Sequence, residues 1–169
     1  GNYTASETSV PEYYDAPSSV SVTLLKNSTM GIYFDNTLKK GNLQITKQSE
    51  DDEIENISFR VSGTSMSGAK VNEVVKTNEK GIATLSDIPI SSSEGYTVEE
   101  LNVPSYYRTP DKKTVSITKG KTTKITMSNV LKKGNLNIVK TSEDGRVKDV
   151  YFCVSGITLN GIPIETTVK

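Results

Sequence analysis

Three polar residues stand where the sequence predicts the buried face of a strand. Lys47, Glu100 and Asn129 each follow two apolar residues at alternate positions, which are Leu43 and Ile45, Tyr96 and Val98, and Ile125 and Met127. Side chains alternate between the two faces of a strand, so each polar group points the same way as the apolar pair before it. Burying a charged group without a partner costs several kcal/mol. We therefore expect the three side chains to meet and to satisfy one another.

Two kinds of chemistry are open to these three side chains once they are in contact. One is structural, a buried ion pair of Lys47 and Glu100 that is hydrogen-bonded to the amide of Asn129. The other is covalent, because burial favours the neutral forms of lysine and glutamate, a neutral amine is a nucleophile, and a protonated carboxyl group polarises an amide carbonyl. Held in contact, the amine can attack the amide and expel ammonia, which leaves a Lys–Asn isopeptide bond. The residue types alone leave both interpretations open.

Short alternating segments must position these residues. Seven such segments lie between residues 43 and 129, at 43–47, 57–63, 71–76, 82–86, 96–101, 114–120 and 122–129. Polar or glycine-bearing turns separate them, and no stretch keeps a helical period. About seven short strands are typical of an immunoglobulin-like sandwich. The sequence therefore predicts an all-β fold, an antiparallel β-sandwich.

The sequence repeats itself at an offset of 93 residues. "YTASETSVPEYY" (3–14) returns as "YTVEELNVPSYY" (96–107), and "NTLKKGNLQITK" (36–47) returns as "NVLKKGNLNIVK" (129–140). Self-similarity at a fixed period is the signature of a tandem array. The repeats join without a Gly/Ser-rich or Pro-rich linker, so we expect a stiff string of domains.

The period divides the chain into three parts. We expect 1–39 to be the C-terminal part of one repeat, 40–132 to be a complete repeat, and 133–169 to be the N-terminal part of a third. The chain opens at Gly1 without an initiator methionine, which predicts a fragment of a longer protein.

The part-repeats carry copies of the three polar residues. Glu7 corresponds to Glu100, Asn36 to Asn129, and Lys140 to Lys47. Each part-repeat lacks strands, so we expect both to be less stable than the complete repeat. If Lys140 of one molecule reached Glu7 and Asn36 of a second molecule, the same reaction would join the chains head to tail. The residues that match 77–93 are missing from both parts, which disfavours that contact.

Composition excludes several classes of protein. Twenty basic and twenty acidic side chains give a formal net charge of zero, which argues against a nucleic-acid binder and a polybasic membrane-surface protein. Histidine is absent and Cys153 is the only cysteine, which excludes Ser/His and Cys/His catalysis, histidine-bound metals and an internal disulfide. We therefore expect no cofactor, no metal, and no enzyme activity beyond single-turnover self-cross-linking.

Weaker signals favour ordinary roles. The acidic run at 49–53 is a calcium candidate, but its copy at 142–146 has fewer acids, which favours a solvated turn. Cys153 is expected to face outward as an incidental thiol. The tyrosine pairs at 13–14 and 106–107 are expected to pack at the ends of a sandwich rather than to bind a glycan or protein.

Several segments of the complete repeat together resemble a known family. These segments, in chain order, are "GNLQITK", "FRVSG", "TNEKGIATLSDIP", "YTVEELNVPSYY" and "ITMSNV". They place a lysine at the end of the first strand, Y-x-x-x-E before a proline and tyrosine, and an asparagine at the end of the last strand. The repeat resembles a Cna B-type domain, the prealbumin-like repeat of Gram-positive adhesins and pilins. The family's usual P-x-G-Y turn reads "PSYY" and "PEYY" here, so we expect a different turn after Pro104.

The resemblance carries implications for the site and the function. It implies an autocatalytic isopeptide bond between Lys47 and Asn129 assisted by Glu100, with Lys140, Asn36 and Glu7 in the same roles in the neighbouring repeats. It also implies a structural stalk repeat of an extracellular, cell wall-anchored adhesin or pilin-like protein. Its partners would be neighbouring repeats of the same chain and, through other domains, a host or matrix protein.

Two other functions compete with the stalk. A ligand-binding adhesive module would grip a host or matrix protein or a glycan, and a large exposed apolar or aromatic patch on the complete repeat would favour it. A transthyretin-like hydrolase is the third interpretation, and the absence of histidine disfavours it.

Overall fold

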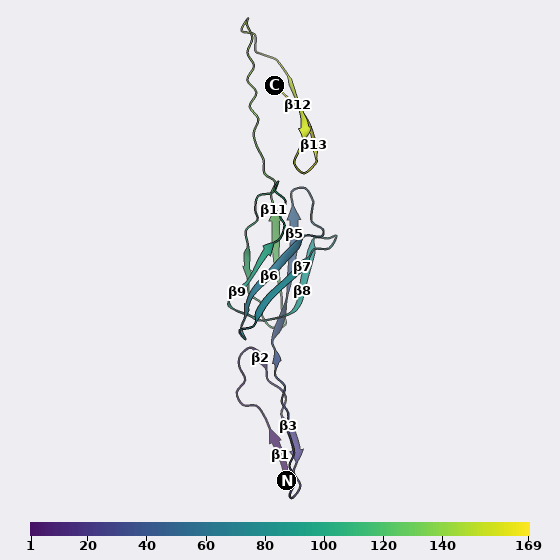
Figure 1. Ribbon diagram of the computed structural model, residues 1–169, viewed down its shortest axis with the longest axis vertical. Coiled ribbons are helices and arrows are strands. Elements are labelled where there is room, and N and C mark those ends of the chain that lie inside the picture. The colour runs from purple at the N-terminus through teal and green to yellow at the C-terminus, as the bar shows by residue number, and fades with distance from the viewer.

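The computed structural model describes residues 1–169, an all-β chain drawn out along one axis with its three parts in a row (Figure 1). We call residues 40–132 the central unit, 1–39 the preceding segment and 133–169 the following segment. The central unit contains β5 (Lys40–Ser49), β6 (Ser58–Ser65), β7 (Lys70–Lys76), β8 (Ile82–Pro89), β9 (Ser91–Glu100), β10 (Lys113–Val115) and β11 (Thr122–Asn129). The preceding segment contains β1 (Asn2–Ala5), β2 (Tyr14–Asp15), β3 (Val20–Thr23) and β4 (Thr37–Leu38), and the following segment contains β12 (Phe152–Ile157) and β13 (Pro163–Val168).

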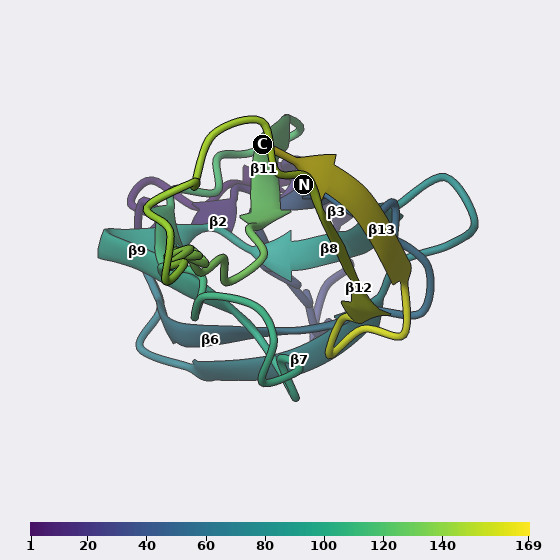
Figure 2. The same ribbon diagram turned by 90° about the horizontal axis from the view of Figure 1, so that it is seen from above.

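The central unit is a sandwich of two sheets. One sheet has the strand order β11-β5-β8 and the other β10-β9-β6-β7. Figure 2 looks down the long axis and shows β8 and β11 on one side of the sandwich, with β6 and β7 on the other. The predicted fold class is therefore confirmed. Neighbouring strands are antiparallel with one exception, because β5 and β11, the first and last strands of the unit, run parallel.

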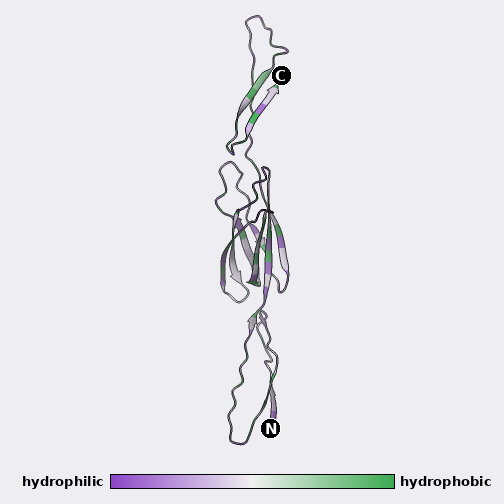
Figure 3. Cartoon of the chain, turned by 90° about the vertical axis from the view of Figure 1, so that its right-hand side faces the viewer, coloured by the Kyte–Doolittle hydropathy of each residue, from purple (hydrophilic) through white to green (hydrophobic).

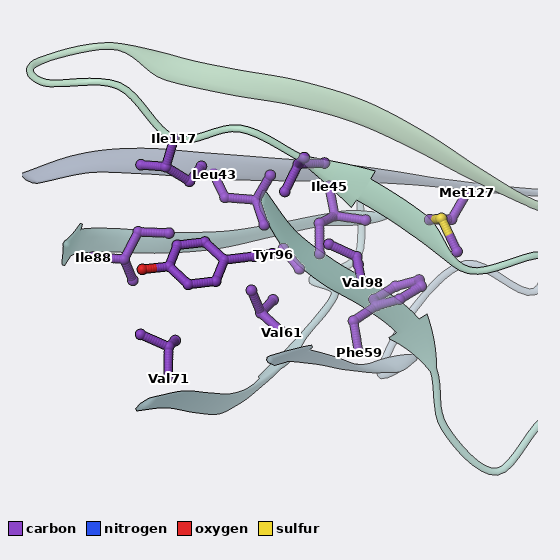
Figure 4. Close-up of a cluster of buried hydrophobic side chains, with 12 residues drawn as sticks. Leu43, Ile45, Phe59, Val61, Val71, Ile88, Tyr96, Val98, Ile117 and Met127 are labelled. Carbon is purple, nitrogen blue, oxygen red and sulfur yellow. The ribbon is translucent and has the colours of Figure 1, made fainter. Parts of the chain in front are cut away.

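The hydrophobic core lies entirely in the central unit. Alternating residues of β5, β6 and β9 face one another across the sandwich, and ten of the core side chains are labelled in Figure 4. Those fully buried include Leu43, Ile45, Phe59, Val61, Tyr96 and Val98. Burying a side chain of this kind contributes roughly 1.5–3 kcal/mol, so this cluster holds the two sheets together.

The turn between β7 and β8 fits closely against β5. Asn78 Oδ1 accepts hydrogen bonds of 3.0 Å from the N–H groups of Lys80 and Ile82, which closes the turn. Gly81 has φ +70°, and a Cβ at this position would lie 2.9 Å from the carbonyl oxygen of Lys47. The Lys47 N–H donates to the Gly81 carbonyl at 2.7 Å. Glycine is therefore required where the turn fixes the backbone of Lys47.

The sixth predicted strand is shorter than the sequence indicates. Alternation predicts a strand over 114–120, whereas β10 ends at Val115. Ile117 is nevertheless buried, because its N–H donates to Ser91 Oγ at 3.1 Å and its carbonyl accepts from the Ser91 N–H at 3.2 Å. These two bonds, between residues 26 apart in the sequence, replace a regular ladder.

The two flanking segments hold only pairs of strands. β1 pairs with β3, β2 with β4, and β12 with β13, and no residue of either segment is buried. In Figure 3 hydrophobic and hydrophilic residues alternate along the strands of the central unit, while its neighbours are thin hairpins. No helix of the structure has the length and hydropathy that crossing a membrane needs.

Candidate cross-linking site

The structure brings Lys47, Glu100 and Asn129 together at one end of the sandwich. Lys47 and Asn129 lie on the parallel neighbours β5 and β11, where Lys47 is opposite Met127 and Asn129 is opposite Ser49. Glu100 is the last residue of β9 and reaches the site from the facing sheet. The two-residue alternation of each strand turns all three side chains inward, as the sequence predicts.

Glu100 contacts both of the other groups. Asn129 Nδ2 donates to Glu100 Oε1 at 2.8 Å, and Lys47 Nζ lies 3.6 Å from Glu100 Oε2. The side chains of Lys47 and Glu100 are 0% and 1% exposed. Lys47 Nζ also donates to the Gln48 carbonyl at 2.8 Å. The carboxylate therefore bridges an amine and a carboxamide in a dry interior.

Two oxygen atoms of the site lack a hydrogen-bond partner. They are Glu100 Oε2 and Asn129 Oδ1, both buried. Buried polar atoms are nearly always hydrogen-bonded in native proteins, and an unsatisfied one costs about 1–3 kcal/mol. Glu100 Oε2, which faces the Lys47 amine without a hydrogen bond, is available to take a proton from it.

Apolar neighbours surround the polar groups. On the ladder, Glu100 is opposite Phe59 and Lys47 is opposite Met127, and both apolar residues are 2% exposed or less. Burial lowers the pKa of Lys47 below its usual value, although the negative charges of Glu100 and Asp51 act in the opposite direction. Loss of the lysine proton is thereby made easier than in water.

An Asn129→Ala variant tests the lowered pKa of Lys47. This variant keeps the amine and the carboxylate but has no amide to react. Because the native pKa of Lys47 lies below its unfolded value of 10.5, the unfolded chain binds more protons between these two values. The free energy of unfolding should therefore rise with pH across that window, level off above 10.5, and stay flat below the native pKa.

Urea unfolding at a series of pH values measures this slope. The control is the double variant Lys47→Met/Asn129→Ala, which removes the amine and leaves the tyrosines unchanged. Equal slopes for the two variants would show that Lys47 titrates normally.

The preceding segment repeats half of this arrangement. Asn36 Nδ2 donates to Glu7 Oε1 at 3.0 Å, just as Asn129 donates to Glu100. Glu7 Oε2 and Asn36 Oδ1 are again buried without a partner. In the following segment Lys140 is exposed and its Nζ donates to the Thr141 carbonyl, as Lys47 does to Gln48. The copies thus keep the same local geometry, but Lys140 does not meet the other two.

Other residues noted in the sequence have different surroundings. Cys153 is exposed. Tyr107 is only 3% exposed and packs on Tyr106, with ring centroids 4.6 Å apart. The "PSYY" turn is closed by a hydrogen bond of 3.1 Å from the Tyr107 N–H to the Pro104 carbonyl.

The residues that sequence reasoning missed are Glu50 and Asp51. The sequence predicts that both lie in a solvated turn. In the structure they bind partners far along the chain, and Asp51 Oδ1 accepts a hydrogen bond of 2.6 Å from Tyr107. The available signal was the repetition of "SED" at 49–51 and 142–144.

A family model and several solved structures match the chain. The model is described as SpaA, prealbumin-like fold domain, and it matches residues 41–131. The Bacillus anthracis TIE protein is 28% identical with a TM-score of 0.43, over 67% of this chain and 19% of that one. GBS52, the minor pilin of Streptococcus agalactiae, is 15% identical with a TM-score of 0.47, over 83% of this chain and 64% of that one.

The shaft pilin SpaA of Lactobacillus rhamnosus GG is 16% identical, with a TM-score of 0.42, over 80% of this chain and 66% of that one. The chain thus spans no more than about two thirds of any of these three proteins. A comparison with curated proteins found no match.

Proposed function

The chain belongs to the family of SpaA prealbumin-like fold domains, and from this premise we propose that it is a stalk segment of a bacterial surface protein, stiffened by an isopeptide bond between Lys47 and Asn129. One observation carries the proposal. A buried glutamate contacts both a buried lysine and a buried asparagine, and the lysine and asparagine lie on the first and last strands of the unit.

The bond forms by acyl transfer from one nitrogen to another. Neutral Lys47 attacks Cγ of Asn129 through Nζ, so that the Nζ–Cγ bond forms and the Cγ–Nδ2 bond breaks. Glu100 moves the proton that Nζ loses to Nδ2, which leaves as ammonia, and the carboxyl group ends as it began. The contact of 2.8 Å between Asn129 Nδ2 and Glu100 Oε1 supports this role. A cavity of about 460 Å³, lined in part by Lys47 and Asn129, gives the ammonia a way out.

The reaction needs only one turnover per molecule. Proximity and burial supply the rate, because the reacting groups are held together by the folded sandwich. The segment is therefore a structural element and not an enzyme. We place it outside the cell on a wall-anchored protein, with neighbouring repeats as its immediate partners and any host ligand bound by other domains.

The surface of the central unit favours the stalk over an adhesive module. Its exposed large apolar residues are Met66, Val74 and Val130, which lie in the β6–β7 turn, on β7 and after β11. Scattered exposed apolar residues are normal for a soluble protein, and a binding site needs a contiguous patch. Tyr107, one of the tyrosines weighed as a ligand contact, is buried instead.

Intact-mass spectrometry of the 169-residue chain tests the bond. The chain should be lighter than its sequence by one ammonia, and a digest should yield a branched peptide joining Lys47 to Asn129. Lys47→Met and Glu100→Gln, which keep approximately the same volume, should have the full mass. The matched controls are Lys124→Met, at an exposed residue, and Glu99→Gln, at the half-buried residue before Glu100, and both should still lose ammonia. An unmodified wild-type chain with its full formula mass would falsify the proposal.

A further inference from the structure

The loop that follows β5 binds the connection that leads to the next repeat. Glu50 Oε2 accepts a hydrogen bond of 2.8 Å from the Leu131 N–H, and Glu50 Oε1 lies 3.1 Å from Lys133 Nζ. Both partners belong to the connection between the central unit and the following segment. Exposed ion pairs of this kind contribute less than about 1 kcal/mol, so Glu50 guides the connection without locking it.

Asp51 binds a more distant part of the same repeat. Its Oδ2 accepts a hydrogen bond of 3.1 Å from Nδ2 of Asn160, which is 109 residues away. Asn160 lies in the turn between β12 and β13, and Figure 1 shows this turn at the end of the following segment that faces the central unit. Asp51 therefore spans the joint between two repeats.

The carboxylate of Asp51 is held in place by side chains of its own repeat. Asp51 Oδ1 accepts hydrogen bonds from Ser49 Oγ at 2.5 Å and from the Tyr107 hydroxyl at 2.6 Å. Burial raises the pKa of Asp51, but the hydrogen bonds from Ser49, Tyr107 and Asn160 outweigh it and lower the pKa below its usual value. The ionised group keeps its second oxygen directed at Asn160.

The partner turn is equally preorganised. Thr158 Oγ1 donates to Asn160 Oδ1 at 2.5 Å, which fixes the amide and leaves its Nδ2 for Asp51. The Gly161 N–H donates to the Thr158 carbonyl, and the Thr158 N–H donates to the Ile162 carbonyl, each at 2.9 Å. Because each side chain is held by its own repeat, forming the contact costs little conformational entropy.

We propose that Ser49, Glu50 and Asp51 form a docking socket for the β-hairpin turn of the following repeat, and that this socket fixes the angle between successive domains. The inference does not depend on the isopeptide bond. Domains joined by a short connection with a small interface move relative to one another by default. A charge-assisted hydrogen bond to a held carboxylate restrains that motion.

The loop that holds the carboxylate recurs at the repeat offset. Ser142 donates to Asp144 in the next copy of the loop, as Ser49 does to Asp51. In that copy Arg146 also contacts Asp144, at 3.5 Å. The hairpin turn of the central unit carries Ser65 and Ser67 at the positions of Thr158 and Asn160, and their hydroxyl groups lie 3.0 Å apart. The carboxylate side of the contact therefore recurs with the same residue types, whereas a serine replaces the amide donor on the turn side.

Spin labels on Cys153 and on a Thr84→Cys variant measure the angle in the whole chain. Cys153 is exposed on β12, and Thr84 is exposed on β8 in the rigid central unit. Double electron–electron resonance should give one narrow distance distribution. Asn160→Asp places a second carboxylate against that of Asp51. Asp51→Asn places a second amide donor against that of Asn160. Each should broaden the distribution and remove its main peak.

The exchanged pair supplies the decisive comparison. In Asp51→Asn/Asn160→Asp, the new amide donates to the new carboxylate and still accepts from Ser49 and Tyr107, so the narrow distribution should return. Asn137→Asp, an exposed change in the following segment, is the charge control and should leave the distribution narrow. A broad wild-type distribution, single variants that stay narrow, or an exchanged pair that stays broad would each overturn the proposal. Intact mass of every variant separates this result from the cross-link.

Discussion

Stretched between its two ends, the chain should yield no length from residues 48–128. Force enters the central unit at the start of β5 and leaves it after β11, and these two strands are parallel neighbours. With Lys47 joined to Asn129, the load passes along β5, through the isopeptide bond, and out of the unit. Strands β6 to β11, which lie between these two residues, are bypassed. The bond thus converts a weak path, made of hydrogen bonds, into a covalent one.

Single-molecule force spectroscopy measures this difference. A Glu100→Gln chain cannot form the bond, so its central unit should unfold and lengthen by about 28 nm, given 3.3–3.6 Å per extended residue. The wild-type chain should lack that step up to forces at which the handles detach. Glu99→Gln changes the half-buried neighbour that bonds Arg60 and Lys112 rather than the site; it is the control and should behave as wild type. A 28 nm step, on the same scale of about 3.3–3.6 Å per residue, in the wild-type trace would show that the load does not pass through a covalent tie.

The site was predictable because it depends on a local pattern. Two-residue alternation places Lys47, Glu100 and Asn129 on the inner faces of their strands, and the cost of burying them singly makes their meeting an expectation. The pattern contains no information on strand neighbours, so the parallel pairing of β5 and β11 could not be foreseen. That pairing decides the path of force through the unit.

The inter-repeat contact was not predictable because its partners are distant. Asp51 lies in an acidic run that is typical of a solvated turn. Its contact between repeats can be recognised only once the fold has placed Asn160 beside it. The shortened β10 has a similar explanation, since the hydrogen bonds between Ser91 and Ile117 depend on where β9 begins. In both cases side chain and backbone bonds between distant residues override the local signal.

Removing Glu100 should destabilise the central unit more than removing Asn129, although both changes abolish the bond. Loss of the tie returns entropy to the unfolded chain. By analogy with a disulfide that closes a loop of this length, this costs about 4–5 kcal/mol. Asn129→Ala should lose about that amount and keep the Lys47–Glu100 ion pair. Glu100→Ala also leaves the fully buried Lys47 ammonium without its counter-charge, which adds about 3–5 kcal/mol.

Urea unfolding of the two variants at pH 7 measures the gap between them. The gap should narrow as pH rises toward 10.5, because Lys47, whose pKa is already lowered by burial, sheds its proton and no longer needs a partner. Glu99→Ala removes surface contacts to Arg60 and Lys112 and should cost less than about 1 kcal/mol at any of these pH values. If Glu100→Ala and Asn129→Ala unfold at the same urea concentration, then Glu100 serves only to form the bond. A gap that closes with pH instead shows that the same carboxylate both neutralises the amine and prepares it to react.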